Sequence, residues 1–124
     1  MRSWQLLNPT RIVFGTGSIQ ELGKHLSNID ARKVMMITDQ TLSKLGVIER
    51  MRQYIPNISV SIYDQVEPNP SSDTIDTATE YARNERVDAI IGLGGGSCLD
   101  TAKVVGLLCC NSGSVVDYLR GELK

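Results

Sequence analysis

The feature that most constrains the fold of this chain is the run Lys33-Val34-Met35-Met36-Ile37-Thr38, which is apolar almost throughout. A strand that faces water on one side alternates polar and apolar residues, whereas a strand covered on both faces is apolar without a break. Asp39 ends the run, and a segment with helical spacing of apolar residues follows it. The run therefore predicts a strand inside a sheet that has helices on both faces.

Strand-like and helix-like segments alternate along the rest of the chain. Strands are expected at residues 11–14, 33–38, 59–63 and 88–93. Helices are expected at residues 18–26, 42–51, 73–86 and 97–109, the first opened by a capping box of Ser18 and Glu21 and the second broken at Gly46. Alternation of this kind indicates an α/β protein with a parallel sheet. The predicted fold is a Rossmann-like, doubly wound parallel sheet.

Length and composition indicate one domain of a soluble protein. A chain of 124 residues can bury a core without disulfides or a structural metal. The net charge of −1, with both signs mixed along the chain, gives no indication of nucleic acid or a membrane surface as a partner. The three cysteines form neither a disulfide framework nor a C-x-x-C pair. With no signal-peptide pattern and no apolar stretch long enough to span a membrane, a cytoplasmic location is expected.

The strongest chemical motif is Gly94-Gly95-Gly96-Ser97, which joins the last predicted strand to a helix. Three glycines leave the turn without side chains, so a ligand can approach the backbone amides closely. The helix that follows adds free N–H groups and the positive end of its dipole, which together favour a phosphate. Ser97 is placed to cap the helix or to donate its hydroxyl to that phosphate. The alternative is a tight turn that binds nothing.

Asp39, at the end of the second predicted strand, is the second candidate. In dinucleotide-binding folds an acidic residue about 20 positions beyond the first glycine turn accepts a hydrogen bond from a ribose hydroxyl. The spacing from Gly17 to Asp39 fits this rule, although Gln20 stands where the full fingerprint has a third glycine. Asp39 is alternatively the N-cap of the next helix, and the two roles are compatible.

The expected sheet topology brings these motifs together. In doubly wound sheets the first and fourth strands are neighbours at the switch point, and ligands bind at the carboxyl ends of the strands. Asp39 and the glycine turn are therefore expected to face one crevice. Asn69, in the stretch Glu67-Pro68-Asn69-Pro70, is expected on the same edge, with a simple turn as the alternative.

Residues 94–103, read as Gly-Gly-Gly-Ser-Cys-Leu-Asp-Thr-Ala-Lys, resemble the G-G-G-S-x-x-D-x-A-K motif of the iron-type alcohol dehydrogenases. Supporting similarities lie, in the family's order, at residues 14–17, 38–39, 66–70 and 117–121. The resemblance covers essentially the whole chain. Ser97 and residues 117–121 favour this family over two related ones, the glycerol dehydrogenases and the dehydroquinate-synthase-like lyases, which remain alternatives. A nucleotide-binding module without catalytic activity is a further alternative.

The resemblance implies a two-domain enzyme that interconverts an alcohol and an aldehyde or ketone, with NAD as the hydride carrier. Residues 1–124 would form its dinucleotide-binding domain. The implied cofactor contacts are Asp39, Asn69, Gly94, Gly95, Gly96, Ser97 and Asp100. For Asp100 and Lys103 a role on the helix surface or at a domain interface is the alternative.

The resemblance places the metal outside this chain. It implies that iron or zinc is bound by one aspartate and three histidines of a separate C-terminal helical domain. His25 is the one histidine here and is expected to be a surface residue, so this chain alone is expected to be inactive. A catalytic thiol is not expected at Cys98, because no histidine partner is in view, and Cys109 and Cys110 are expected to pack in the helix. A homodimer formed through the N-terminal region, with Trp4, Leu6 and Leu7, is also implied.

Overall fold

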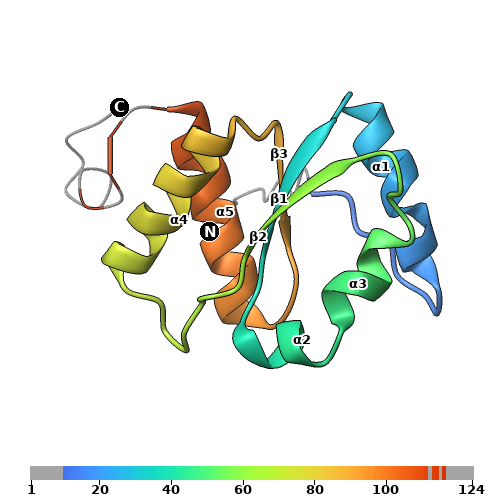
Figure 1. Ribbon diagram of the computed structural model, residues 1–124, viewed down its shortest axis with the longest axis horizontal. Coiled ribbons are helices and arrows are strands. Elements are labelled where there is room, and N and C mark those ends of the chain that lie inside the picture. The colour runs from blue at the N-terminus through green and yellow to red at the C-terminus, as the bar shows by residue number, and fades with distance from the viewer. Residues whose placement is uncertain (1–9, 112, 115, 117–124) are drawn as a thin grey trace, which may run out of the picture.

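A parallel sheet of three strands forms the centre of the molecule (Figure 1). The computed structural model describes residues 10–111, 113, 114 and 116. The strands are β1 (Lys33–Ile37), β2 (Ser59–Tyr63) and β3 (Ala89–Gly92), and their order in the sheet is β2-β1-β3. The predicted apolar run is thus the central strand of the described sheet, with a parallel neighbour on each side.

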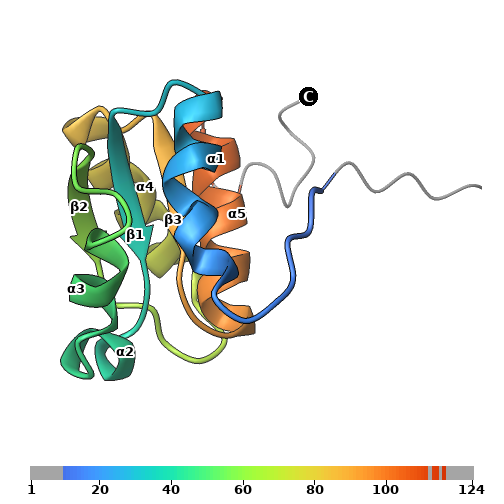
Figure 2. The same cartoon turned by 90° about the vertical axis from the view of Figure 1, so that its right-hand side faces the viewer.

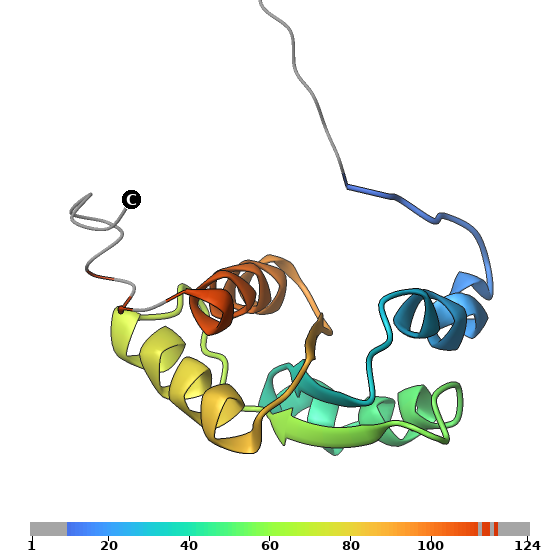
Figure 3. The same cartoon turned by 90° about the horizontal axis from the view of Figure 1, so that it is seen from above.

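Helices cover both faces of this sheet (Figures 1 and 3). They are η1 (Ser18–Glu21, a 3-10 helix), α1 (Leu22–Asn28), α2 (Gln40–Lys44), α3 (Val47–Arg52), α4 (Ser72–Glu85) and α5 (Gly96–Cys110). α1 and α3 contribute to the core on one face, and α4 and α5 contribute to the core on the other. The three-layer α/β fold predicted from the alternating pattern is confirmed.

The two cores divide β1 by alternate residues. Val34 and Met36 point toward the α1 and α3 side, whereas Met35 and Ile37 point toward the α4 and α5 side. All four side chains are 0% exposed. Since burying one such side chain stabilises a fold by about 1.5–3 kcal/mol, this strand is a major contributor to both cores. The unbroken apolar run is explained by this double burial.

The predicted strand at residues 11–14 is wrong. These residues are extended but have no strand partner within the described part of the chain, and they run outside the layers (Figure 2). Ile12 is 75% exposed and Phe14 is 99% exposed. A strand exists only where a neighbour satisfies its backbone, and none of the described strands pairs with residues 11–14. A β-rich local composition could not reveal this.

The predicted capping box is also wrong, whereas the break at Gly46 is confirmed. Ser18 lies inside η1, whose N-cap is Gly17 at φ 79°, and no side chain caps that helix. Gly46 adopts φ 73° and serves as the N-cap of α3, so the predicted helix is indeed divided into α2 and α3. Left-handed backbone at these two positions is what glycine supplies at low cost.

Candidate functional site

Strand register places two of the sequence candidates side by side. β1 and β3 are parallel neighbours, with Ile37 opposite Gly92 at their carboxyl ends. Asp39 follows the first of these strands and the glycine turn follows the second. The two motifs therefore face one crevice, as expected, but the predicted pairing of the first and fourth strands is wrong. The adjacent strands are the second and fourth of the predicted four, because residues 11–14 form no strand.

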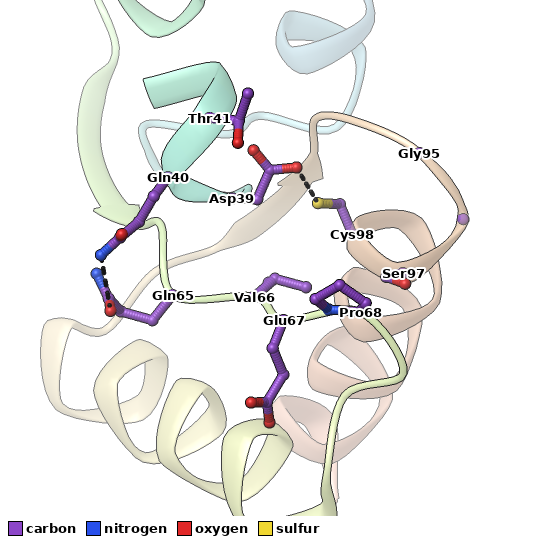
Figure 4. Close-up of a pocket in the computed structure, with 11 residues that line it drawn as sticks. Asp39, Gln40, Thr41, Gln65, Val66, Glu67, Pro68, Gly95, Ser97 and Cys98 are labelled. Carbon is purple, nitrogen blue, oxygen red and sulfur yellow. Dashed lines mark hydrogen bonds between the residues drawn. The ribbon is translucent and has the colours of Figure 1, made fainter. Parts of the chain in front are cut away.

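A pocket of about 550 Å³ opens at this edge of the sheet (Figure 4). Its walls come from the loops after β1 and β2 and from the first turn of α5. The residues that line it are Asp39, Gln40, Thr41, Gln65, Val66, Glu67, Pro68, Gly95, Gly96, Ser97 and Cys98. This volume lies within the range of about 300–1,000 Å³ that is common for small-molecule and cofactor sites.

Thr38 connects the three strand ends from which the loops of the pocket begin. Its backbone N–H donates to the carbonyl of Tyr63 at 2.9 Å, and its hydroxyl donates to the carbonyl of Leu93 at 2.7 Å. Its own carbonyl accepts from the N–H of Val66 at 3.2 Å. One fully buried residue thus joins the carboxyl ends of all three strands, which fixes the loops that carry the pocket.

Asp39 is the N-cap of α2, which confirms one of its two predicted roles. Its Oδ1 accepts from the backbone N–H of Leu42 at 2.8 Å. Its Oδ2 lies 3.7 Å from the thiol sulfur of Cys98, which donates to it (Figure 4). Each carboxylate oxygen has a second lone pair, so both retain capacity to accept from a ligand in the pocket.

In the glycine turn, the fold requires glycine at one position, and at two others it leaves space for a side chain. Gly94 adopts φ 141°, and a Cβ there would lie 2.9 Å from the sulfur of Cys98. A Cβ at Gly95 or Gly96 would meet nothing within 4 Å. Gly94 is therefore needed for packing, whereas the backbone at Gly95 and Gly96 is bare toward the pocket.

The N-terminus of α5 faces the same space. Its N-cap is Gly95, and no side chain caps the helix, so the predicted capping role of Ser97 is wrong. The first intrahelical bond runs from the N–H of Leu99 to the carbonyl of Gly95 at 3.0 Å, which leaves the three preceding N–H groups of the helix without such a bond. By contrast, α2 and α4 are capped by the side chains of Asp39 and Ser71. An uncapped helix N-terminus beside a glycine turn favours an anion.

Asn69, Gly94 and Asp100 lie outside the lining of the pocket. Asn69 is exposed and adopts φ 53° in the turn between the pocket loop and α4. Asp100 and Lys103 are exposed on α5. Of the predicted contact residues, the structure brings together Asp39, Gly95, Gly96 and Ser97.

Sequence reasoning missed the residues that the loop after β2 contributes. Gln65 and Glu67 line the pocket from that loop, and Gln40 donates through Nε2 to Oε1 of Gln65 at 3.3 Å. The hydroxyl of Thr74 donates to Glu67 at 2.8 Å, and this bond, with further ones from Ser71, holds the pKa of Glu67 below its ordinary value. The pocket wall therefore carries two carboxylates, Asp39 and Glu67, with neither lysine nor arginine among its lining residues.

A metal does not fit the residues that the structure describes. They contain no group of three or more His, Cys, Asp and Glu side chains able to hold an ion. His25 lies on α1, with its Nε2 3.6 Å from Oε2 of Glu21 at the end of η1, and it is not among the residues that line the pocket. The thiol of Cys98 has its pKa raised by burial and by the charge of Asp39, so it stays protonated and is not a nucleophile near neutral pH.

None of the helices formed by the described residues has the length and apolar character needed to cross a membrane.

Comparison with known proteins identifies the family. The family model for iron-containing alcohol dehydrogenase matches residues 9–124. The NAD-dependent methanol dehydrogenase of Bacillus methanolicus is 33% identical over 112 residues, which are 89% of this chain and 29% of that protein. Long-chain-alcohol dehydrogenase 1 of Geobacillus thermodenitrificans is 35% identical over 122 residues, which are 92% of this chain and 31% of that protein.

The fold is shared with a solved member of the same group. The NADH-dependent butanol dehydrogenase A of Thermotoga maritima superposes with a TM-score of 0.90 at 32% identity, and the match covers 100% of this chain and 32% of that one. The chain thus spans about a third of the length of the proteins that it matches. Since the family model matches almost the whole chain, the chain belongs to the iron-containing alcohol dehydrogenase family.

Proposed function

We propose that this chain is the NAD-binding domain of a metal-dependent alcohol dehydrogenase, which interconverts an alcohol and an aldehyde or ketone by hydride transfer. The observation that carries the proposal is the pocket between Asp39 and the uncapped N-terminus of α5. When bound, the nicotinamide cofactor supplies the hydride acceptor or donor, and the protein supplies its binding and orientation. The family membership and the names of the relatives support this proposal.

The pyrophosphate of NAD would lie against the glycine turn. Gly95 and Gly96 leave open space where any other residue would place a Cβ, so a phosphate can reach the backbone. The first N–H groups of α5 and the positive end of its dipole supply the attraction in a wall without cationic side chains. Ser97 adds a hydroxyl at the same turn.

Asp39 would accept hydrogen bonds from the adenosine ribose, and this favours NAD over NADP. A carboxylate accepts from a 2′-hydroxyl but repels a 2′-phosphate. Glu67 adds a second negative charge to the pocket, and no lysine or arginine lines it to balance a phosphate. We keep Asn69, Gly94 and Asp100 as proposed contacts of a more complete site. Asn69 and Gly94 adjoin residues of the pocket lining in the sequence, and Asp100 lies two positions after Cys98.

The metal and the substrate pocket belong, in this proposal, to a separate helical domain. The matched proteins are about three times as long as the matched segment, which supports such a domain. Iron or zinc would be bound there, and the chemistry that it supplies is polarisation of the substrate oxygen. The substrate class is a small alcohol and its aldehyde or ketone.

We also propose that the protein is a cytoplasmic homodimer. The three cysteines are free, which supports a reducing compartment. Trp4, Leu6 and Leu7, from which the dimer contact was inferred, lie outside the described residues. Light scattering of the intact enzyme tests the dimer, and a monomer at high concentration would contradict it.

Binding of NAD to the 124-residue chain, followed by isothermal titration calorimetry, tests the proposal. Gly95→Val is expected to abolish binding without loss of the fold, because Gly95 adopts φ −81° and its Cβ direction is open. Gly106→Ala is the matched control, since Gly106 lies on α5 but does not line the pocket. If Gly95→Val binds NAD as tightly as the wild type, the turn is merely structural.

A further inference from the structure

The thiol of Cys98 lies between the two parts of the proposed cofactor site, Asp39 and the glycine turn. Cys98 lies in the first turn of α5, 59 positions from Asp39, and its sulfur lies 3.7 Å from Oδ2 of that carboxylate. A Cβ added at Gly94 would lie 2.9 Å from the same sulfur, so the thiol lies directly beneath the glycine turn. The side chain is 2% exposed, so it fills the space beneath the turn rather than facing solvent.

The two bonds to Asp39 hold its carboxylate in one orientation. The N–H of Leu42 fixes Oδ1, and the thiol of Cys98 fixes Oδ2 from the opposite wall of the pocket (Figure 4). With only the first bond, a carboxylate can still rotate about its Cβ–Cγ bond, because that torsion is broad. With both, the carboxylate is held in place and each of its oxygens keeps a second lone pair for a ligand in the pocket.

We propose that Cys98 is a positioning residue that orients Asp39 for the ribose diol and so sharpens the choice of NAD over NADP. This inference rests on the proposed function, in which Asp39 accepts from the ribose. The thiol acts as a donor because burial and the neighbouring carboxylate raise its pKa and keep it protonated. The S–H group is a weak donor, so the effect on selectivity is expected to be modest.

The test is the ratio of the NADP and NAD dissociation constants, measured on the 124-residue chain and its variants. Cys98→Ala removes the donor and is expected to lower this ratio by about two- to tenfold, the range that one neutral hydrogen bond supplies. Cys98→Ser keeps a donor and is expected to hold the ratio near that of the wild type. Cys98→Val also lacks the donor but opens no cavity, so its ratio is expected to fall as in the alanine variant.

Two controls separate positioning from packing. Cys109→Ala removes a thiol from the far end of the same helix, outside the pocket lining, and is expected to leave the ratio unchanged. Asp39→Ser keeps an N-cap oxygen but removes the carboxylate, and in that background Cys98→Ala is expected to have no effect on the ratio. Loss of affinity for both cofactors by the same factor in Cys98→Ala and Cys98→Val would show a structural role only and would overturn the inference.

The failure of this inference is distinguishable from failure of the proposed function. A wild-type chain that binds NAD more tightly than NADP, with Cys98→Ala and Cys98→Val unchanged, overturns the role of Cys98 and leaves the NAD site standing. A wild-type chain that binds neither dinucleotide overturns the proposed function, and the role of Cys98 falls with it.

Discussion

The hydroxyl of Thr38 donates to the carbonyl of Leu93 across 2.7 Å, and this bond joins the residue before Asp39 to the residue before the glycine turn. One buried side chain, which is 0% exposed, therefore fixes the relative position of the two parts of the proposed cofactor site. A change at Thr38 would act on the two walls of the pocket together, although Thr38 itself is absent from the pocket lining.

Thr38→Val is expected to lower the free energy of unfolding by about 1–3 kcal/mol, because the partly buried carbonyl of Leu93 then loses its hydroxyl donor. Thr38→Ser keeps the hydroxyl and is expected to cost less than the valine variant. Urea unfolding followed by circular dichroism measures both. Equal stability of the valine variant and the wild type would show that the bond contributes nothing net.

Gly94→Ala is expected to destabilise the fold, in contrast to substitutions at Gly95. The backbone at Gly94 has φ 141°, and a Cβ would come within 2.9 Å of the sulfur of Cys98 and 3.1 Å of a methyl carbon of Leu42. A strained backbone position alone costs on the order of 1–3 kcal/mol. Thermal unfolding of Gly94→Ala and Gly95→Ala side by side measures the difference, and equal melting temperatures would contradict this account of the turn.

Asp39→Gly is expected to relax the preference for NAD while leaving the fold largely intact. Replacing an N-cap side chain by glycine costs helix stability by only a few tenths of a kcal/mol. The loss of the carboxylate removes the repulsion of a 2′-phosphate, so the affinity for NADP should rise relative to that for NAD. Titration of both cofactors into the variant checks this, and an unchanged ratio of affinities would exclude Asp39 as the ribose acceptor.

Acid is expected to weaken the fold partly through Glu85. Its Oε2 lies 3.0 Å from the ammonium of Lys33, and the hydrogen bond and charge of Lys33 hold the pKa of Glu85 below the ordinary value of 4.5. A carboxylate with a lowered pKa in the folded chain contributes stability that is fully present above pH 4.5 and is lost as the pH falls through the folded pKa.

Melting temperatures measured from neutral pH down to about pH 3 should therefore fall less steeply below the ordinary glutamate pKa in Glu85→Gln than in the wild type. Glu80→Gln, an exposed position on the same helix, is the control for the loss of one negative charge. An identical acid slope in Glu85→Gln and the wild type would contradict a contribution from this ion pair.

Local patterns were sufficient for the parts of the fold whose cause is local. The apolar run predicted β1 because double burial leaves no polar face, and Gly46 predicted the break between α2 and α3 because a left-handed residue ends a helix. Asp39 was recognisable as an N-cap from its place before a helix. These features depend on residues within a few positions of one another.

Features that depend on distant residues were beyond such patterns. Residues 11–14 have the composition of a strand, yet whether they pair depends on a free sheet edge beside them. The path of the loop after β2 brings Gln65 and Glu67 to the pocket wall, and Val66, which lies between them, is buried in the core with α4 and α5. The contact between Cys98 and Asp39 depends on the register of β1 with β3, which no local motif encodes.

The last prediction is that the 124-residue chain alone shows no dehydrogenase activity, even with added iron or zinc. Hydride transfer needs the alcohol held against the nicotinamide with its oxygen polarised as charge develops. A transition-metal site needs several imidazole or carboxylate ligands at fixed positions, and this chain has one histidine, His25 on α1. The chain is still expected to bind NAD, because Asp39 and the glycine turn share one pocket.

Turnover is measured by following nicotinamide absorbance in the presence of NAD, metal and a panel of short alcohols. Gly95→Val is the control for cofactor-dependent signal. Turnover above a metal-free blank that disappears in Gly95→Val would show that the catalytic groups lie within this chain.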